Sequence, residues 1–180
     1  MTLIRVRGDD ADVLTVVGAL RLEAWGRLLG PDAAAARFGV DHHDTGAWHC
    51  LALDEGAPVA AGRLTVHSNL DDLPESTSFG PYLGQMRVPL GFASRLVVHP
   101  AHQGRGHAAR IIVDRLVLAA ELDLLEVWGE TRRHKVHGLT RHGYEPVGPS
   151  PDDSVPGEWV ILRAPLDPGS HRGSGTAPGR

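Results

Sequence analysis

The residues of this chain best suited to chemistry lie near its middle, in the segment Ser94–Arg110. There an apolar run ends, a short loop carries Gly104 and Gly106, and a helical pattern begins at once. Glycines in such a loop let the backbone approach a ligand closely, and the free amides at a helix start attract anions. Because Arg105 and Arg110 add positive charge at the same end, the sequence predicts a site for phosphate groups.

Other interpretations of this loop compete with a simple phosphate site. A Walker loop ends in Gly-Lys-Ser/Thr, whereas Gly106 is followed by His107 and Ala108. A dinucleotide fingerprint fits Gly104-x-Gly106-x-x-Ala109, with Glu126 about 20 residues further on. The glycines there follow their strand only after Pro100 and further residues, and repeated strand–helix alternation is missing, so we favour this interpretation less. A purely structural glycine turn stays open as well.

Three motifs resemble those of the GNAT (GCN5-related) N-acyltransferase family. The loop, Leu96-x-Val98-x-Pro100-x-x-Gln103-x-x-Gly106-x-Ala108, is similar to the family's acyl-CoA-binding signature. Gly56-x-Pro58-Val59-x-x-Gly62-Arg63-Leu64 resembles a hairpin of the family. Gly143-Tyr144-Glu145-x-Val147-Gly148 resembles the Gly-Phe/Tyr that closes its fourth helix. Together the motifs span roughly residues 48–163 in the family's order.

The resemblance implies an α+β fold whose central sheet is mixed, mostly antiparallel and flanked by helices. In that fold the strands at 92–98 and 124–128 splay into a V that holds the thioester of an acyl-CoA, acetyl-CoA being the first expectation, with no metal. The amide of Val98 would bind the oxyanion. The cofactor would contact Leu96, Val97, Val98, Gln103, Gly104, Arg105, Gly106, His107 and Ala108.

The catalytic half of the chain departs from the family. The usual glutamate or histidine on the strand before the loop corresponds to Phe92 and Ser94, and the usual helix tyrosine corresponds to Leu139. Strand alternation predicts Ser94 on the face of Phe92, Leu96 and Val98, with Arg95 opposite. Tyr144 is expected to pack under the sheet with its hydroxyl satisfied locally. Our candidates are Ser94, Glu126 and His137 for catalysis, and His67, Phe92 and Trp128 for the acceptor pocket.

The elements that must position these residues follow from hydrophobic spacing. Helices are expected from Asp10 to Gly30 and at 32–38, 106–122 and 132–142. Gly62 within a strand predicts a bulge or a close backbone approach. The segment 68–90, which lacks a clear period, predicts a lid or binding loop. Strands are expected at 3–7, 48–53, 58–66, 92–98, 124–128, 144–147 and 158–162.

Composition narrows the class of protein. The 180 residues suit one domain over 1–167, followed by a tail at 168–180 that is expected to be disordered. A net charge of −4 argues against nucleic acid as a partner. The single cysteine, Cys50, favours a reducing cytoplasm, and no apolar run is long enough to span a membrane. His42, His43, His49 and Cys50 are interpreted as a polar loop rather than a metal site.

Taken together, the sequence predicts a cytoplasmic acyl-CoA-dependent N-acyltransferase that acts on an amine of a small molecule or amino-acid-like acceptor. The alternative is a catalytically silent GNAT-like domain that binds acyl-CoA as a sensor, because the family's usual acid and base are missing. An enzyme that acetylates proteins is a third interpretation. The acceptor, the acyl length and a homodimer stay open.

Overall fold

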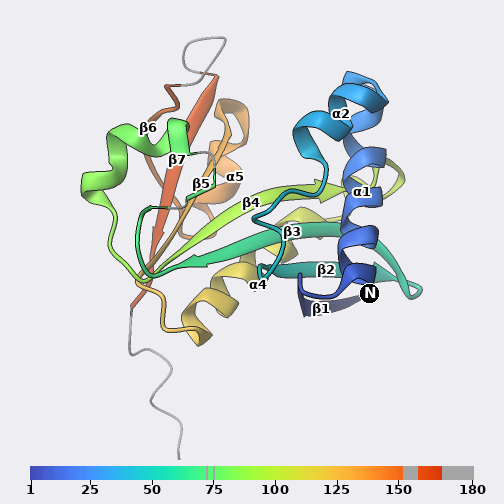
Figure 1. Ribbon diagram of the computed structural model, residues 1–180, viewed down its shortest axis with the longest axis horizontal. Coiled ribbons are helices and arrows are strands. Elements are labelled where there is room, and N and C mark those ends of the chain that lie inside the picture. The colour runs from blue at the N-terminus through green and yellow to red at the C-terminus, as the bar shows by residue number, and fades with distance from the viewer. Residues whose placement is uncertain (72, 75, 152–157, 168–180) are drawn as a thin grey trace, which may run out of the picture.

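A seven-stranded sheet, in the order β1-β2-β3-β4-β5-β7-β6, organises the computed structural model (Figure 1). The structure describes residues 1–71, 73–74, 76–151 and 158–167. Neighbouring strands run antiparallel except β4 and β5, which are parallel, so the expected mixed α+β architecture is confirmed. The strands are β1 (Thr2–Arg7), β2 (Trp48–Asp54), β3 (Ala57–His67), β4 (Leu90–Val98), β5 (Glu126–Arg132), β6 (Glu145–Pro149) and β7 (Trp159–Pro165).

Helices cover both faces of this sheet. On one face, α1 (Ala11–Leu29) packs on β3 and β4, and α2 (Pro31–Phe38) follows it. On the other, α4 (His107–Glu121) packs on β2, β3 and β4. As expected, an aspartate caps α1: the Asp10 side chain accepts from the Asp12 amide at 2.8 Å. The short helical elements are α3 (Ser76–Phe79), η1 (Gly80–Gln85), η2 (Pro100–His102), η3 (Arg133–Lys135) and α5 (Val136–Thr140).

The sheet opens into a V between β4 and β5. The two strands pair only at their beginnings, through Leu90 with Glu126, Gly91 with Val127 and Phe92 with Trp128. Beyond this point β4 stays with β3 while β5 stays with β7, and Figure 1 shows the two groups of strands diverging. The expected splay between these strands is therefore present.

A β-bulge shapes the β4 wall of the V. The β3–β4 register shifts between Ala61 and Arg63, around the predicted bulge residue Gly62, and Arg95 takes a φ of +53°. Ser94 and Arg95 both reach the side where Arg63 and Asp41 lie, because the extra residue interrupts strand alternation.

The bulge corrects one expectation from simple alternation. Phe92 packs with Phe79 on one face of the sheet, whereas Leu96 and Val98 pack with the α4 core on the other. Ser94 therefore shares a face with Phe92 but not with Leu96 and Val98, and the expected opposite orientation of Arg95 is wrong.

Part of the segment 68–90, which was expected to be a lid or binding loop, packs into the core. It forms α3 and η1, and the Phe79 ring meets the Phe92 ring edge-on with centroids 4.6 Å apart. Two element boundaries also differ from expectation. The strand expected at 124–128 runs from Glu126 to Arg132, and the helix expected at 132–142 is reduced to η3 and α5.

Two segments with sequence-based expectations, 152–157 and 168–180, are not among the described residues. The first belongs to the expected turn between the last two strands, and the second is the tail that was expected to be disordered. None of the helices in the described part of the chain combines the length and apolarity needed to cross a membrane.

Candidate active site

The loop between β4 and α4 has the geometry that its glycines predicted. Gly104 has a φ of +76° and Gly106 a φ of +80°, in the left-handed region that favours glycine. A Cβ on either residue would meet no other atom within 4 Å, so both positions border open space. The loop therefore presents its backbone outward, directly before α4.

The first turn of α4 is suited to an anion. Gly106 is its N-cap, and within the described residues no side chain caps the helix. Its first amides are thus available to an outside acceptor. Gln103 and Arg105 are exposed beside this turn, while His107 and Ala108 begin the helix with His107 only 5% exposed.

Charge around the loop is mixed. Arg105 approaches Asp54 of β2 at 3.9 Å, and His102 approaches the same carboxylate at 3.4 Å. Arg110 contacts the sulfur of Met1 at 2.7 Å. The Arg105 side chain is 59% exposed, so it can turn from Asp54 towards a bound phosphate.

The backbone of β4 offers donors to the open V. The His99 amide donates to the Val59 carbonyl oxygen of β3 at 2.8 Å. Since amides alternate in direction along a strand, the amides of Val98 and Leu96 point away from β3. These two residues and the buried Val97 form the wall where the pantetheine arm was expected.

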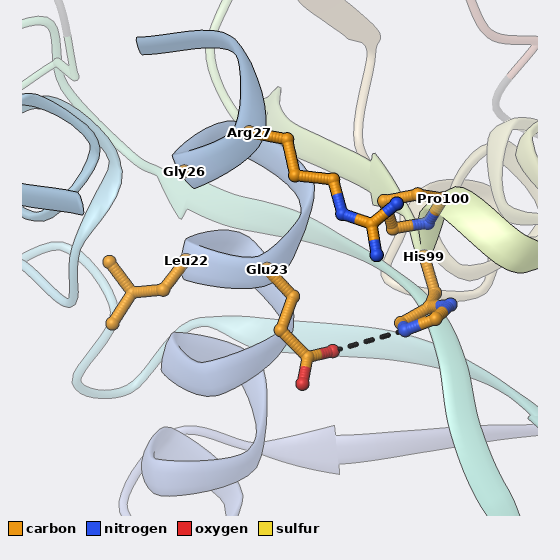
Figure 2. Close-up of a pocket in the computed structure, with 6 residues that line it drawn as sticks. All are labelled: Leu22, Glu23, Gly26, Arg27, His99 and Pro100. Carbon is orange, nitrogen blue, oxygen red and sulfur yellow. Dashed lines mark ion pairs between the residues drawn. The ribbon is translucent and has the colours of Figure 1, made fainter. Parts of the chain in front are cut away.

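A hollow beside the start of the loop connects it to α1. Figure 2 shows the Glu23 carboxylate directed at the His99 ring, an ion pair of 3.3 Å, with the Arg27 side chain extended towards Pro100. The hollow, of about 260 Å³, is lined by Leu22, Glu23, Gly26, Arg27, His99 and Pro100. Helix α1 thus positions the residue at which β4 passes into the loop.

Two of the three residues expected to shape the acceptor pocket are buried in the core. Phe92 is 1% exposed and Trp128 0% exposed, and both pack with Phe79. His67 is half-buried at the end of β3, beside Leu90, and its Nε2 lies 2.7 Å from Thr65 Oγ1. His67 therefore lies at the closed end of the V.

The three expected catalytic residues lie in different surroundings. Ser94 is half-buried on the β4 wall, and its Oγ accepts from Arg63 Nε at 3.0 Å. Glu126 is 0% exposed at the closed end, where Oε1 accepts from the Trp128 indole at 2.6 Å and from the Arg87 amide at 2.7 Å. His137 is exposed on α5, with Nε2 2.7 Å from Arg141 Nη2. The fold does not bring these three side chains together.

A buried cluster of charges, which sequence reasoning missed, lies behind Ser94. Arg21 forks onto Asp44 with distances of 2.8 and 2.7 Å, and Arg63 Nη1 lies 3.2 Å from the same carboxylate. We call it the arginine–aspartate cluster. It carries one more positive than negative charge, and its members are Arg21, Asp41, Asp44, Arg63 and Arg95.

Both aspartates of the cluster are held ionised. Burial alone would raise the pKa of the Asp44 carboxyl, but the hydrogen bonds and charge of Arg21 hold it far below its usual range. Burial likewise opposes ionisation of Asp41, and the charge of Arg63 with the hydrogen bond from Arg95 lowers its pKa. Neither carboxylate is suited to accept a proton near neutral pH.

His49 and Cys50, which were expected in a polar loop with His42 and His43, lie on a buried strand instead. His49 and Cys50 are fully buried on β2, with His49 Nε2 3.2 Å from the Asp44 carbonyl oxygen. Burial lowers the pKa of the His49 imidazole and raises that of the Cys50 thiol to about 12. These two side chains belong to the core below the loop that carries His42 and His43.

Tyr144 packs under the sheet as expected, next to α4. It is 3% exposed, and burial raises the pKa of its hydroxyl. Within the described residues this hydroxyl has no hydrogen-bond partner, so the expectation of local satisfaction is wrong. Leu139, at the family's tyrosine position, packs against the same core.

Solved structures share this fold. An acyl-CoA N-acyltransferase from Pseudomonas aeruginosa matches with a TM-score of 0.64 and 18% identity, over 91% of this chain and 98% of the other. ElaA from Escherichia coli gives 0.65 and 15%, over 91% and 98%. GCN5 from Tetrahymena gives 0.60 and 10%, over 93% and 98%. No protein-family model and no curated protein matches the sequence.

These likenesses define the class of fold. The parallel β4–β5 pair that opens into a V, followed by the glycine loop and α4, is the GNAT architecture, and this chain adopts it. At 10% to 18% identity the comparison concerns the fold and not the reaction.

Proposed function

We propose that this protein is an acyl-CoA-dependent N-acyltransferase that transfers an acetyl group directly to an amine of a small-molecule or amino-acid-like acceptor. The observation that carries the proposal is the uncapped first turn of α4 at the end of the β4 wall. Such a turn binds phosphates through its amides, while the V beside it can hold the rest of an extended thioester.

The chain's own groups suffice for the binding part of this reaction. The amides from Gln103 to Ala108 would hold the pyrophosphate, and Arg105 would add a charge-assisted hydrogen bond. The amides of Leu96 and Val98 would hold the pantetheine arm and the thioester oxygen, on which negative charge develops as the amine attacks. Ser94 would lie beside the reacting carbonyl.

A second candidate function is a silent acyl-CoA sensor. It is favoured by Leu139, which packs into the core at the position of the family's acid, and by the buried Phe92 on β4. Neither side chain can move a proton, so binding without turnover would follow if no other residue supplied that chemistry.

One experiment separates the two functions. The protein is titrated with acetyl-CoA by calorimetry and then incubated with acetyl-CoA and a panel of amines while thiol release is followed. Acetyl-CoA binding with thiol release that depends on an amine is expected for the enzyme. Binding with no turnover on any amine would favour the sensor.

The loop assignment has its own test. Gly106→Glu places a carboxylate where the phosphates would bind, and it should abolish acetyl-CoA binding. The matched control is Gly106→Gln, because it keeps the strain of a side chain at a φ of +80° and removes only the added charge. Retained binding in Gly106→Glu would contradict the phosphate site.

A further inference from the structure

Ser94 presents an unused hydroxyl proton on the β4 wall of the V. Its side chain is half-buried, and its Oγ accepts from Arg63 Nε at 3.0 Å. A serine hydroxyl has one proton to donate, and the hydrogen bonds among the described residues give the Ser94 proton no acceptor. The guanidinium also polarises the O–H bond, which makes this hydroxyl a stronger donor. Ser94 can therefore donate a hydrogen bond to a ligand in the opening.

The charge behind this hydroxyl is positive. The arginine–aspartate cluster has three guanidinium groups and two carboxylates, and both carboxylates are ionised. Arg63 is 0% exposed, and its Nη2 is buried without a hydrogen-bond partner among the described residues. A buried charge that is not fully paired is costly, so an anion bound at Ser94 would offset part of that cost. A cationic group at the same place would be repelled.

The carboxylates of the cluster do not make this place suitable for a cation, because arginines already bind them. Asp41 Oδ1 accepts from Arg63 Nη1, and Asp41 Oδ2 accepts from Arg95 Nη2 at 2.8 Å. Asp44 is 0% exposed and binds Arg21 and Arg63. Both aspartates therefore hold arginines in place behind Ser94.

The two faces of the sheet separate the cofactor from the second substrate. Leu96 and Val98 pack with the α4 core, on the face where the glycine loop leads into α4. Ser94 lies on the opposite face, which α1 covers and where Arg21 of α1 joins the cluster (Figure 1). Acetyl-CoA bound at the loop would leave this opposite face to the acceptor.

We propose that the acceptor carries a carboxylate besides its amine and that Ser94 binds this carboxylate, an inference that rests on the proposed acyl transfer. Strand geometry places Ser94 about 7 Å from Leu96 and about 13 Å from Val98, whose amides would hold the pantetheine arm and the thioester. The carboxylate and the reacting amine are therefore several bonds apart. An ω-amino acid, or an α-amino acid that reacts through a side-chain amine, has this spacing.

The substrate test compares acceptors that differ only at the end opposite the amine. The wild type is given acetyl-CoA with ω-amino acids of increasing chain length, the corresponding ω-amino amides and the parent alkylamines. At the best chain length, kcat/KM for the amino acid should exceed that for the amide by about tenfold or more, because a hydrogen bond to a charged group is lost in the amide. Ser94→Ala should reduce this ratio towards one, and Ser94→Thr, which keeps a hydroxyl, should retain part of it. The control Ser68→Ala removes an exposed hydroxyl just after β3 and should leave the ratio unchanged.

A binding measurement tests the same site without turnover. Pentanoate has the carboxylate of such an acceptor but no amine, and ligand-observed NMR should detect its binding to the wild type. Pentanamide, which has the same length and no charge, should bind much more weakly. Ser94→Ala should lose most of the pentanoate binding, and its acetyl-CoA binding shows that the variant is folded.

The outcomes separate this inference from the proposed function. Equal use of amino acids and amides by the wild type, or a preference for amides or diamines, would overturn the carboxylate site and leave the acyltransferase intact. Selectivity for the carboxylate that Ser94→Ala retains would overturn the role of Ser94. If the wild type binds pentanoate through Ser94 and acetylates no amine, the proposed transfer fails while the carboxylate site stands.

Discussion

Arg115 Nη1 on α4 lies 3.2 Å from the carbonyl oxygen of Ser94, at the bulge where β4 leaves β5. The same nitrogen donates to the Arg63 carbonyl oxygen at 3.3 Å, and the side chain is only 3% exposed. One buried guanidinium thus donates hydrogen bonds to two backbone carbonyl oxygens, at the point where the bulge interrupts the pairing of β3 with β4. The helix that follows the glycine loop also stabilises the wall of the V.

Arg115→Met should destabilise the fold and weaken acetyl-CoA binding. Removing the guanidinium leaves two buried carbonyl acceptors without this donor, and we expect a loss of about 3 kcal/mol in the free energy of unfolding. Urea denaturation measures it. The control Arg141→Met removes an exposed arginine and should change stability by less than about 0.5 kcal/mol. Equal stabilities of the two variants would contradict the role of Arg115.

Asp44→Asn should be among the most damaging polar substitutions. It leaves Arg21, 1% exposed, without the carboxylate that it binds, and breaking a buried pair costs about 3–5 kcal/mol. The matched change Asp9→Asn affects only an exposed pair with Arg7 at 3.7 Å, whose contribution is expected to be near zero. Thermal or urea unfolding of both variants decides the comparison.

The same carboxylate predicts how stability depends on pH. The pKa of Asp44 is lower in the folded protein than its value of about 3.9 in an unfolded chain, so the ionised form stabilises the fold at neutral pH. This contribution is complete above about pH 4 and is lost as the pH falls further. Asp44→Asn should therefore lose less stability between pH 5 and about 2.5 than the wild type does, and parallel curves would contradict this.

Gly106→Ala should reduce both stability and cofactor binding. At a φ of +80° an alanine costs about 1–2 kcal/mol, although its Cβ would touch nothing. Relief of that strain would turn the backbone of the loop and misplace its amides, so the Kd for acetyl-CoA should rise. Gly138→Ala is the control, because Gly138 is a helical residue of α5 without positive φ or close neighbours. A Kd unchanged in Gly106→Ala would show that the loop conformation does not matter.

Gly129→Ala tests the apex of the V. A Cβ there would lie 2.7 Å from the Ala93 carbonyl oxygen, and a backbone atom of β4 cannot move aside as a side chain can. The expected cost is about 1–3 kcal/mol of stability. Gly80→Ala, whose Cβ meets nothing within 4 Å, should be nearly neutral. A melting temperature for Gly129→Ala equal to that of the wild type would mean that β4 and β5 are not in close contact at this point.

Much of the fold could be predicted from local sequence. The helix after Asp10, the β2–β3 hairpin and the glycine loop before α4 depend on capping residues, alternation and positive φ, which neighbouring residues determine. The segment 68–90 could not be predicted in this way. Its helical turns are short and irregular, and contacts such as that of Phe79 with the distant Phe92 hold them in place.

The sequence by itself determined the conformation of the loop that we propose as the cofactor site, since the residues from Gln103 to Ala108 are adjacent in the chain and their geometry is local. Only the tertiary structure decided which side chains flank the V. Phe92 and Trp128 are 36 positions apart in the sequence, and they meet at the closed end of the V only because β4 and β5 pair there. Arg115 and the arginine–aspartate cluster are likewise assembled from separate elements. Long-range strand register and packing have no signature in the spacing of neighbouring residues, because they depend on contacts between residues far apart in the chain.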